Sequence, residues 1–166
     1  DNRKNISNTP RFSIALLSAI ALGYELLLMR LFSIIQWHHF AFMVISLALL
    51  GYGVSGTFLT IRSDRLLSKY PRNFLVNILL FAISSLGLFL VAQQIPFNAQ
   101  EVLWDSNQLW FLLLLYLTLA LPFFFAANAI GLSMMACRPH IAQIYSADML
   151  GAASGSIGIV LMLFIV

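Results

Sequence analysis

Long apolar runs alternate with short polar stretches along the chain, and the length of these runs predicts the fold. A hydrocarbon core about 30 Å thick requires roughly 20 apolar residues in a helix. Five segments meet this requirement, at about residues 12–35, 40–61, 74–92, 109–137 and 145–166. The pattern therefore predicts an all-α, polytopic transmembrane helix bundle of about five spans over residues 12–166, after a polar flank at residues 1–11.

The fourth apolar segment is too long for an upright span, and Pro122 lies near its middle. Proline lacks the backbone N–H that an inner helical position donates, and its ring displaces the preceding turn. We expect Pro122 to kink this helix or to divide it into two half-helices.

Composition supports a membrane location. The 166 residues are 61% hydrophobic and 9% charged, with a mean hydropathy of +0.92. A soluble domain usually carries about 25% charged residues, so this chain has too few polar groups to cover a water-facing surface. The one cysteine, Cys137, excludes an intrachain disulfide and is expected to be an inert packing thiol.

The basic residues predict the orientation and exclude a nucleic-acid partner. If the helices alternate in direction, eight basic residues fall on one side. They are Arg3, Lys4, Arg11, Arg62, Arg65, Lys69, Arg72 and Arg138. The opposite loops contain no Lys or Arg, so the positive-inside bias places the N-terminus in the cytoplasm. The loop at residues 93–108 mixes apolar residues with polar ones, and we expect it to lie along the outer interface.

Two charged residues lie inside the first predicted span. Glu25 falls near the bilayer midplane, and Arg30 lies nearer the outer leaflet. Their separation of five residues is about 140° around a helix, so each is expected to face another helix instead of its neighbour. Arg30 can also extend outward to the headgroups. Glu25 is either a carboxyl that locks helix packing or a proton or cation site in a transport path.

Asp148 falls in the first turn of the fifth predicted helix. A carboxylate there meets unpaired amide groups and the positive end of the helix dipole. The sequence therefore favours a capping role for Asp148, at a depth different from that of Glu25.

Small residues form two stripes at helical spacing. One lies at the end of the second predicted helix and contains Gly51, Ser55 and Gly56. The other lies on the fifth and contains Ala147, Gly151, Gly155 and Gly158. Such stripes allow helix backbones to approach closely in a membrane, and we expect both to be packing faces.

Trp37, His38 and His39 follow one another at the outer end of the first span. Adjacent residues point about 100° apart on a helix, so both histidines cannot face one metal or macrocycle. One of them could ligate a haem or pigment axially; an interfacial Trp-His-His belt is the plainer interpretation. No metal or cofactor is otherwise expected in this segment.

The sequence contains no known catalytic or nucleotide-binding signature. It lacks a phosphate-binding GxxxxGK motif, a strand followed by GxGxxG, a GxSxG elbow and an HExxH zinc motif. The chain begins without Met and stops within an apolar run, from which we expect a piece of a longer polypeptide.

Four motifs follow one another along most of the chain. They are Gly23 with Tyr24-Glu25 and Arg30, the glycine-rich stretch 50–56, Leu121-Pro122 with Gly131, and Tyr145, Ala147, Asp148, Gly151, Ala152 and Gly155. In this order they resemble the membrane-embedded relatives of spermidine synthase in bacteria. The resemblance implies the N-terminal helices of a protein in the bacterial cytoplasmic membrane. It also implies that a soluble aminopropyltransferase-like domain follows, so this segment alone should have no transferase activity.

The primary functional hypothesis is a membrane domain that anchors and assembles such a protein through close helix packing, with the bilayer and other transmembrane helices or subunits as partners. A first alternative is a carrier for a small cationic molecule such as a polyamine, with Glu25 as its binding site and the Pro122 break as a flexible element. A second alternative is an accessory subunit of a larger energy-converting membrane complex.

Overall fold

The computed structural model describes residues 10–35, 41–95, 104 and 106–165, and its regular elements are helices. They are α1 (Arg11–Ile35), α2 (Ala41–Ser68), α3 (Tyr70–Ala92), α4 (Asn107–Ala136), the short 3₁₀-helix η2 (Arg138–His140) and α5 (Ile141–Ile165). The five α-helices are each long and apolar enough to cross a membrane. The all-α prediction and the number of spans are confirmed for the described residues.

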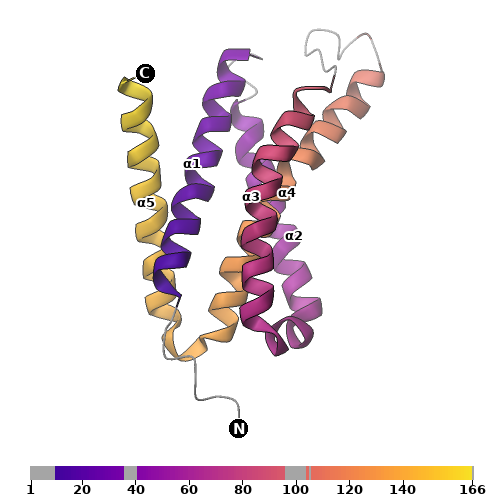
Figure 1. The fold of residues 1–166 in the computed structure, drawn as a ribbon. Coiled ribbons are helices and arrows are strands. Elements are labelled where there is room, and N and C mark those ends of the chain that lie inside the picture. The colour runs from indigo at the N-terminus through magenta and orange to yellow at the C-terminus, as the bar shows by residue number, and fades with distance from the viewer. Residues whose placement is uncertain (1–9, 36–40, 96–103, 105, 166) are drawn as a thin grey trace.

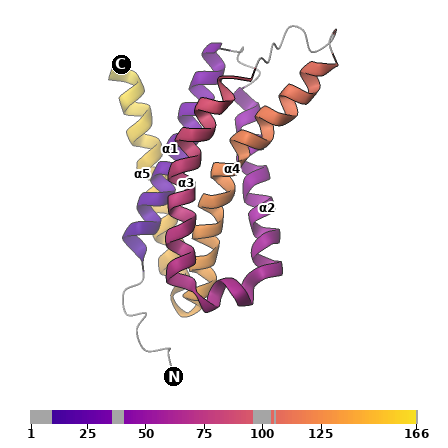
Figure 2. The ribbon, with the colours of Figure 1, turned by 45° about the vertical axis from the view of Figure 1, so that its right-hand side comes forward.

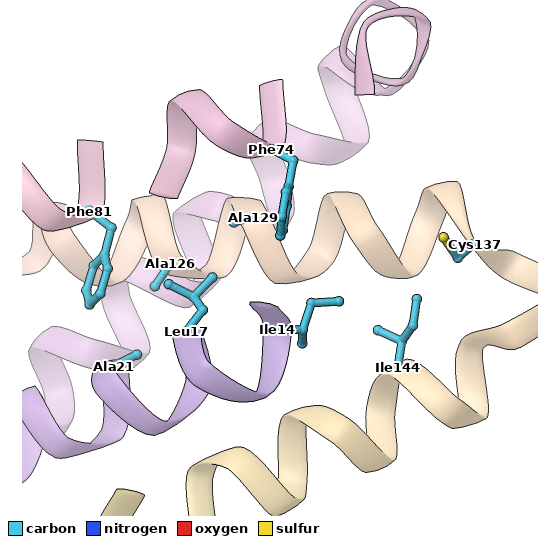
Figure 3. Packing of buried hydrophobic residues seen from close by; sticks show 9 residues of the cluster. All are labelled: Ile14, Leu17, Ala21, Phe74, Phe81, Ala126, Ala129, Cys137 and Ile144. Carbon is cyan, nitrogen blue, oxygen red and sulfur yellow. The ribbon is translucent and has the colours of Figure 1, made fainter. Parts of the chain in front are cut away.

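The helices form two groups that meet mainly where α1 lies against α2, with further contacts of α4 to α1 and α5 (Figure 1). In one group α1 packs against α5, and in the other α4 packs against both α2 and α3. Figure 3 shows one of the two cores between the helices, in which Leu17 and Ala21 of α1 lie opposite Ala126 of α4. The second core is centred on Phe123 of α4 and residues of α1 and α2 around it. The α5 helix packs only lightly against α4.

The helices α2, α3 and α5 are longer than the spans predicted from the apolar runs. The α2 helix continues to Ser68 and α3 begins at Tyr70, so Lys69 alone separates them. The α5 helix begins at Ile141, directly after the turn that contains Pro139. Hydropathy identifies the part of a helix that matches the hydrocarbon core, whereas backbone hydrogen bonding continues through the polar residues at its end.

The α4 helix is bent but continuous. Figure 2 shows its first half running obliquely and its second half upright. Pro122 is buried near the middle, and the helix has no interruption between Asn107 and Ala136. The predicted kink is therefore present, and the alternative of two separate half-helices is wrong.

Positive charge gathers at one end of the bundle. The start of α1, the turn between α2 and α3 and the turn between α4 and α5 all lie at this end (Figure 1). Among the described residues it carries every Lys and Arg except Arg30, which is exposed toward the other end of α1. The outward faces between the two ends are apolar; Leu86 of α3 and Leu150 of α5, for example, are 73% and 70% exposed.

We predict that Phe123→Ala destabilises the bundle. Phe123 is fully buried and belongs to the core that joins α1, α2 and α4, so its loss opens a cavity that costs about 3 kcal/mol in the free energy of unfolding. Unfolding of the purified protein by sodium dodecyl sulfate in mixed micelles measures this change.

Phe164→Ala is the matched control, because this side chain is 85% exposed at the end of α5. A Phe123 variant no less stable than the Phe164 variant would contradict the position assigned to this core.

Candidate functional site

Asp148 lies inside the bundle and does not cap α5. The helix begins at Ile141, and its first turn contains no acidic residue. Asp148 is half-buried and accepts a hydrogen bond from the Ser18 hydroxyl of α1. The capping prediction is therefore wrong, because the polar residues before the apolar run are already helical and move Asp148 about two turns inward.

Ser18 has two acceptors for its single proton. Its hydroxyl lies 2.9 Å from the carbonyl oxygen of Ile14, and it also contacts Asp148. An ionised Asp148 accepts a hydrogen bond from the Ser18 hydroxyl. A protonated Asp148 instead donates a hydrogen bond to the Ser18 oxygen, while Ser18 donates to the Ile14 carbonyl oxygen. The local hydrogen bonding thus accommodates either charge state of the carboxyl.

Asp148 borders a cavity of about 350 Å³ between the two groups of helices. The lining comes from α1, α2, α4 and α5 and is almost entirely apolar. It consists of Ser18, Ala21, Leu22, Tyr52, Ala127, Ile130, Gly131, Met134, Asp148, Met149 and Ala152. No basic side chain lines this cavity, and Ser18 is the only hydrogen-bond partner of Asp148 among the described residues.

Two tyrosines contact the Phe123 ring, and one of them, Tyr52, lines this cavity. The Tyr24 ring is 5.6 Å from the Phe123 ring between centroids, and the Tyr52 ring is 6.1 Å away in an edge-to-face arrangement. The Tyr24 hydroxyl is buried without a hydrogen-bond partner among the described residues. Tyr52 lines the cavity together with Asp148.

Glu25 lies on the same face of α1 as Ser18, because a spacing of seven residues is close to two full turns. It is half-buried, two residues beyond the centre of α1. Glu25 and Arg30 form no ion pair with each other or with another described residue. This agrees with the expectation that they are poor partners on one helix. Glu25 is half-buried, but Arg30 is exposed and does not face another helix among the described residues, as had been expected.

Two further polar contacts join the helices, and sequence reasoning missed them. The Ser55 hydroxyl of α2 donates to Asn128 Oδ1 of α4 at 2.8 Å, and both residues are buried. The Tyr70 hydroxyl of α3 lies 3.2 Å from the hydroxyl of buried Ser133. Asn128 is the one side-chain amide in the long apolar run of α4 beyond Pro122. A single polar residue in such a run could have predicted a contact with another helix.

The small-residue stripe of α5 packs against α1 over part of its length. A methyl group on Gly151 would overlap the backbone of Ala15, and one on Gly155 would overlap the backbone of Ala19. Gly158 has open space beside it, and Ala147 is half-buried. Gly151 and Gly155 therefore lie in the contact with α1, as expected, whereas Gly158 faces away from α1 into open space, although its neighbour Ile159 still contacts Gly23.

The α2 stripe behaves similarly. A methyl group on Gly51 would lie 2.7 Å from Phe123 Cβ and 2.8 Å from the Ala120 carbonyl oxygen, so α2 and α4 are in backbone contact there. Gly56 is exposed with open space beside it and is not part of the packing face. On α1 the residues that receive α5 are Ala15 and Ala19, a small-xxx-small pair that the sequence also contains.

The remaining predicted sites are separate from this interior. Cys137 is a buried free thiol at the end of α4, and burial raises its pKa. His140 is exposed in η2. No group of three His, Cys, Asp or Glu side chains suitable for a metal ion occurs in the described part of the chain. Trp37, His38 and His39 lie outside the described residues, as does most of the predicted interfacial loop, residues 96–103 and 105.

The chain shows no significant match to any protein-family model, curated protein or solved structure. The chemistry of the site is therefore derived from its own residues. They comprise one half-buried carboxylate, Asp148, with a serine partner and one phenol, Tyr52, at an apolar cavity, whereas Glu25 and Tyr24 lie outside its lining. This arrangement can hold helices together and can also offer a negative charge to a small molecule.

We predict that Gly155→Ala destabilises the bundle by about 1–3 kcal/mol, because the added methyl group must separate the α1 and α5 backbones. Gly158→Ala is the control. It adds the same group to the same helix in open space, where alanine is the better helix former. Unfolding in mixed micelles measures both variants, and equal stabilities would contradict the close contact at Gly155.

Proposed function

We propose that this chain is a multi-pass domain of the bacterial cytoplasmic membrane with its N-terminus in the cytoplasm, and that it anchors and assembles a larger protein through close helix packing. The observation that carries this proposal is the backbone contact of α5 with α1 at Gly151 and Gly155. Between membrane helices there is little hydrophobic driving force, so association depends on small residues and interhelical hydrogen bonds.

The outward faces support the bilayer as surroundings. The five helices carry large apolar side chains on the outside, and Phe164 and Ile165 are 85% and 86% exposed. A soluble protein rarely exposes contiguous apolar surface of this extent, whereas lipid tails or further transmembrane helices cover it without cost. The basic end of the bundle supports a cytoplasmic N-terminus by the positive-inside bias.

The proposed spermidine-synthase-like parent rests on the order of the sequence motifs, and several residues of these motifs make contacts between helices. Three residues of the family-like motifs face other helices: Gly23 lies against Ile159, Tyr24 contacts Phe123, and Asp148 contacts Ser18. Motif residues are thus used for helix contacts, as an assembly domain requires. In such a parent the transferase chemistry belongs to a downstream soluble domain, and the helices supply the anchor.

The topology is tested by cysteine labelling in intact cells of a Cys137→Ala background. Lys69→Cys is expected to react with a membrane-impermeant maleimide only after permeabilisation, because Lys69 lies at the basic end. Trp104→Cys, at the opposite end and 88% exposed, is expected to react in intact cells. The reverse pattern would contradict the orientation, and extraction of the protein by alkaline carbonate would contradict membrane integration.

The family assignment is tested independently by the gene that encodes the chain. We expect the reading frame to continue into a domain with a cofactor-binding glycine motif and acidic polyamine-binding residues. A stop codon directly after the codon for Val166, or a downstream domain of another class, would contradict the spermidine-synthase-like parent. Either result would leave the labelling experiment unaffected.

A further inference from the structure

The cavity beside Asp148 combines a negative charge with apolar walls. Its other lining residues are alanine, glycine, leucine, isoleucine, methionine, one serine and Tyr52. A carboxylate in such surroundings is costly unless it is paired or protonated, and charged residues inside membrane helices usually mark a functional site. No basic side chain among the described residues lines the cavity, so a cationic ligand would supply the counter-charge.

The lining also indicates what kind of cation would fit. Ca²⁺ and Mg²⁺ require about six or more oxygen ligands, and here the side-chain oxygens come only from Ser18, Tyr52 and Asp148. The volume of about 350 Å³ is far larger than a bare ion and falls within the range of small-molecule sites. A ligand with one cationic group and an apolar body would match both the carboxylate and the walls.

Tyr52 supplies a second element of recognition. It lines the cavity from α2, as Asp148 does from α5. An aromatic ring attracts a cation near its face, and its hydroxyl accepts a hydrogen bond from an ammonium group. The carboxylate and the phenol thus come from different groups of helices and line one cavity.

We propose that this cavity binds a small organic monocation, whose ammonium group pairs with Asp148 and whose apolar part lies against the helices around it. This goes beyond anchoring and does not depend on it. The site is also distinct from a carrier site at Glu25, because Glu25 does not line the cavity. A carrier for a cation would require such a site, but binding alone is what the structure supports.

The test uses the purified protein in nanodiscs of zwitterionic phosphatidylcholine, with hexylammonium as the probe and uncharged hexanol as its matched control. Titration calorimetry, corrected with empty nanodiscs, is expected to show saturable binding of one hexylammonium per chain. Hexanol is expected to bind at least tenfold more weakly. Equal binding of the two probes would overturn the proposal, because the cavity would then be a purely apolar pocket, and so would the absence of saturable binding.

Asp148→Asn removes the charge and keeps an oxygen that accepts from Ser18, so we expect a folded protein with at least tenfold weaker hexylammonium binding. Glu25→Gln and Asp64→Asn are expected to change binding by less than about threefold, because neither residue lines the cavity. Unchanged binding in the folded Asp148 variant, or a larger loss in the Glu25 variant, would overturn the assignment.

A second pair of variants tests the cavity without altering any charge. Ala152→Leu fills space beside Asp148, whereas Ala153→Leu places the same side chain on an exposed face of α5. We expect the first to reduce hexylammonium binding at least tenfold and the second to leave it unchanged. Equal binding by the two variants would show that the probe binds elsewhere, even if the Asp148 variant failed to fold.

Discussion

The contact between the backbones of α1 and α5 determines how the rest of the interior is arranged. Gly151 and Gly155 leave no side chain between the helices, so Ala15 and Ala19 lie directly against them. This contact fixes the rotation of α5 and brings Asp148 to Ser18, which lies on α1 between the two alanines. Without the contact between α1 and α5, the Asp148 carboxylate would not lie beside the Ser18 hydroxyl. The small residues are therefore the reason that a charged group can be placed at a specific point inside apolar sequence.

The helices pack more closely within each group than between the two groups. Gly51 brings α2 into backbone contact with α4, and the buried Ser55–Asn128 hydrogen bond reinforces that pair. The α5 helix, in contrast, packs only lightly against α4, and the cavity lies where the two groups meet. This difference in packing explains the cavity. The closely packed pairs α1–α5 and α2–α4 hold Asp148 and Tyr52, and the less closely packed boundary between the two groups leaves space for the cavity.

Much of the fold could be predicted from the sequence, because helix length follows from the thickness of a hydrocarbon layer. Pro122 likewise predicted the bend in α4. The role of Asp148 could not be predicted, since it depended on a helix start at Ile141 that hydropathy placed four residues later. Spacing identified Gly151 and Gly155 but could not show that Gly158 is turned away from α1 into open space. Asn128 and Tyr52 were missed because only the fold shows which face of an apolar helix is turned inward.

The central claim is that α1 and α5 meet with Ser18 against Asp148, and cross-linking tests it most directly. In a Cys137→Ala background, Ser18→Cys combined with Asp148→Cys should be joined by mild oxidation or by mercuric ion in native membranes. The control combines Ser18→Cys with Leu150→Cys, which is 70% exposed and lies about 200° around α5 from Asp148. The structure predicts a cross-link in the first pair and none in the second. Cross-linking in the control pair alone, or in neither pair, would contradict it.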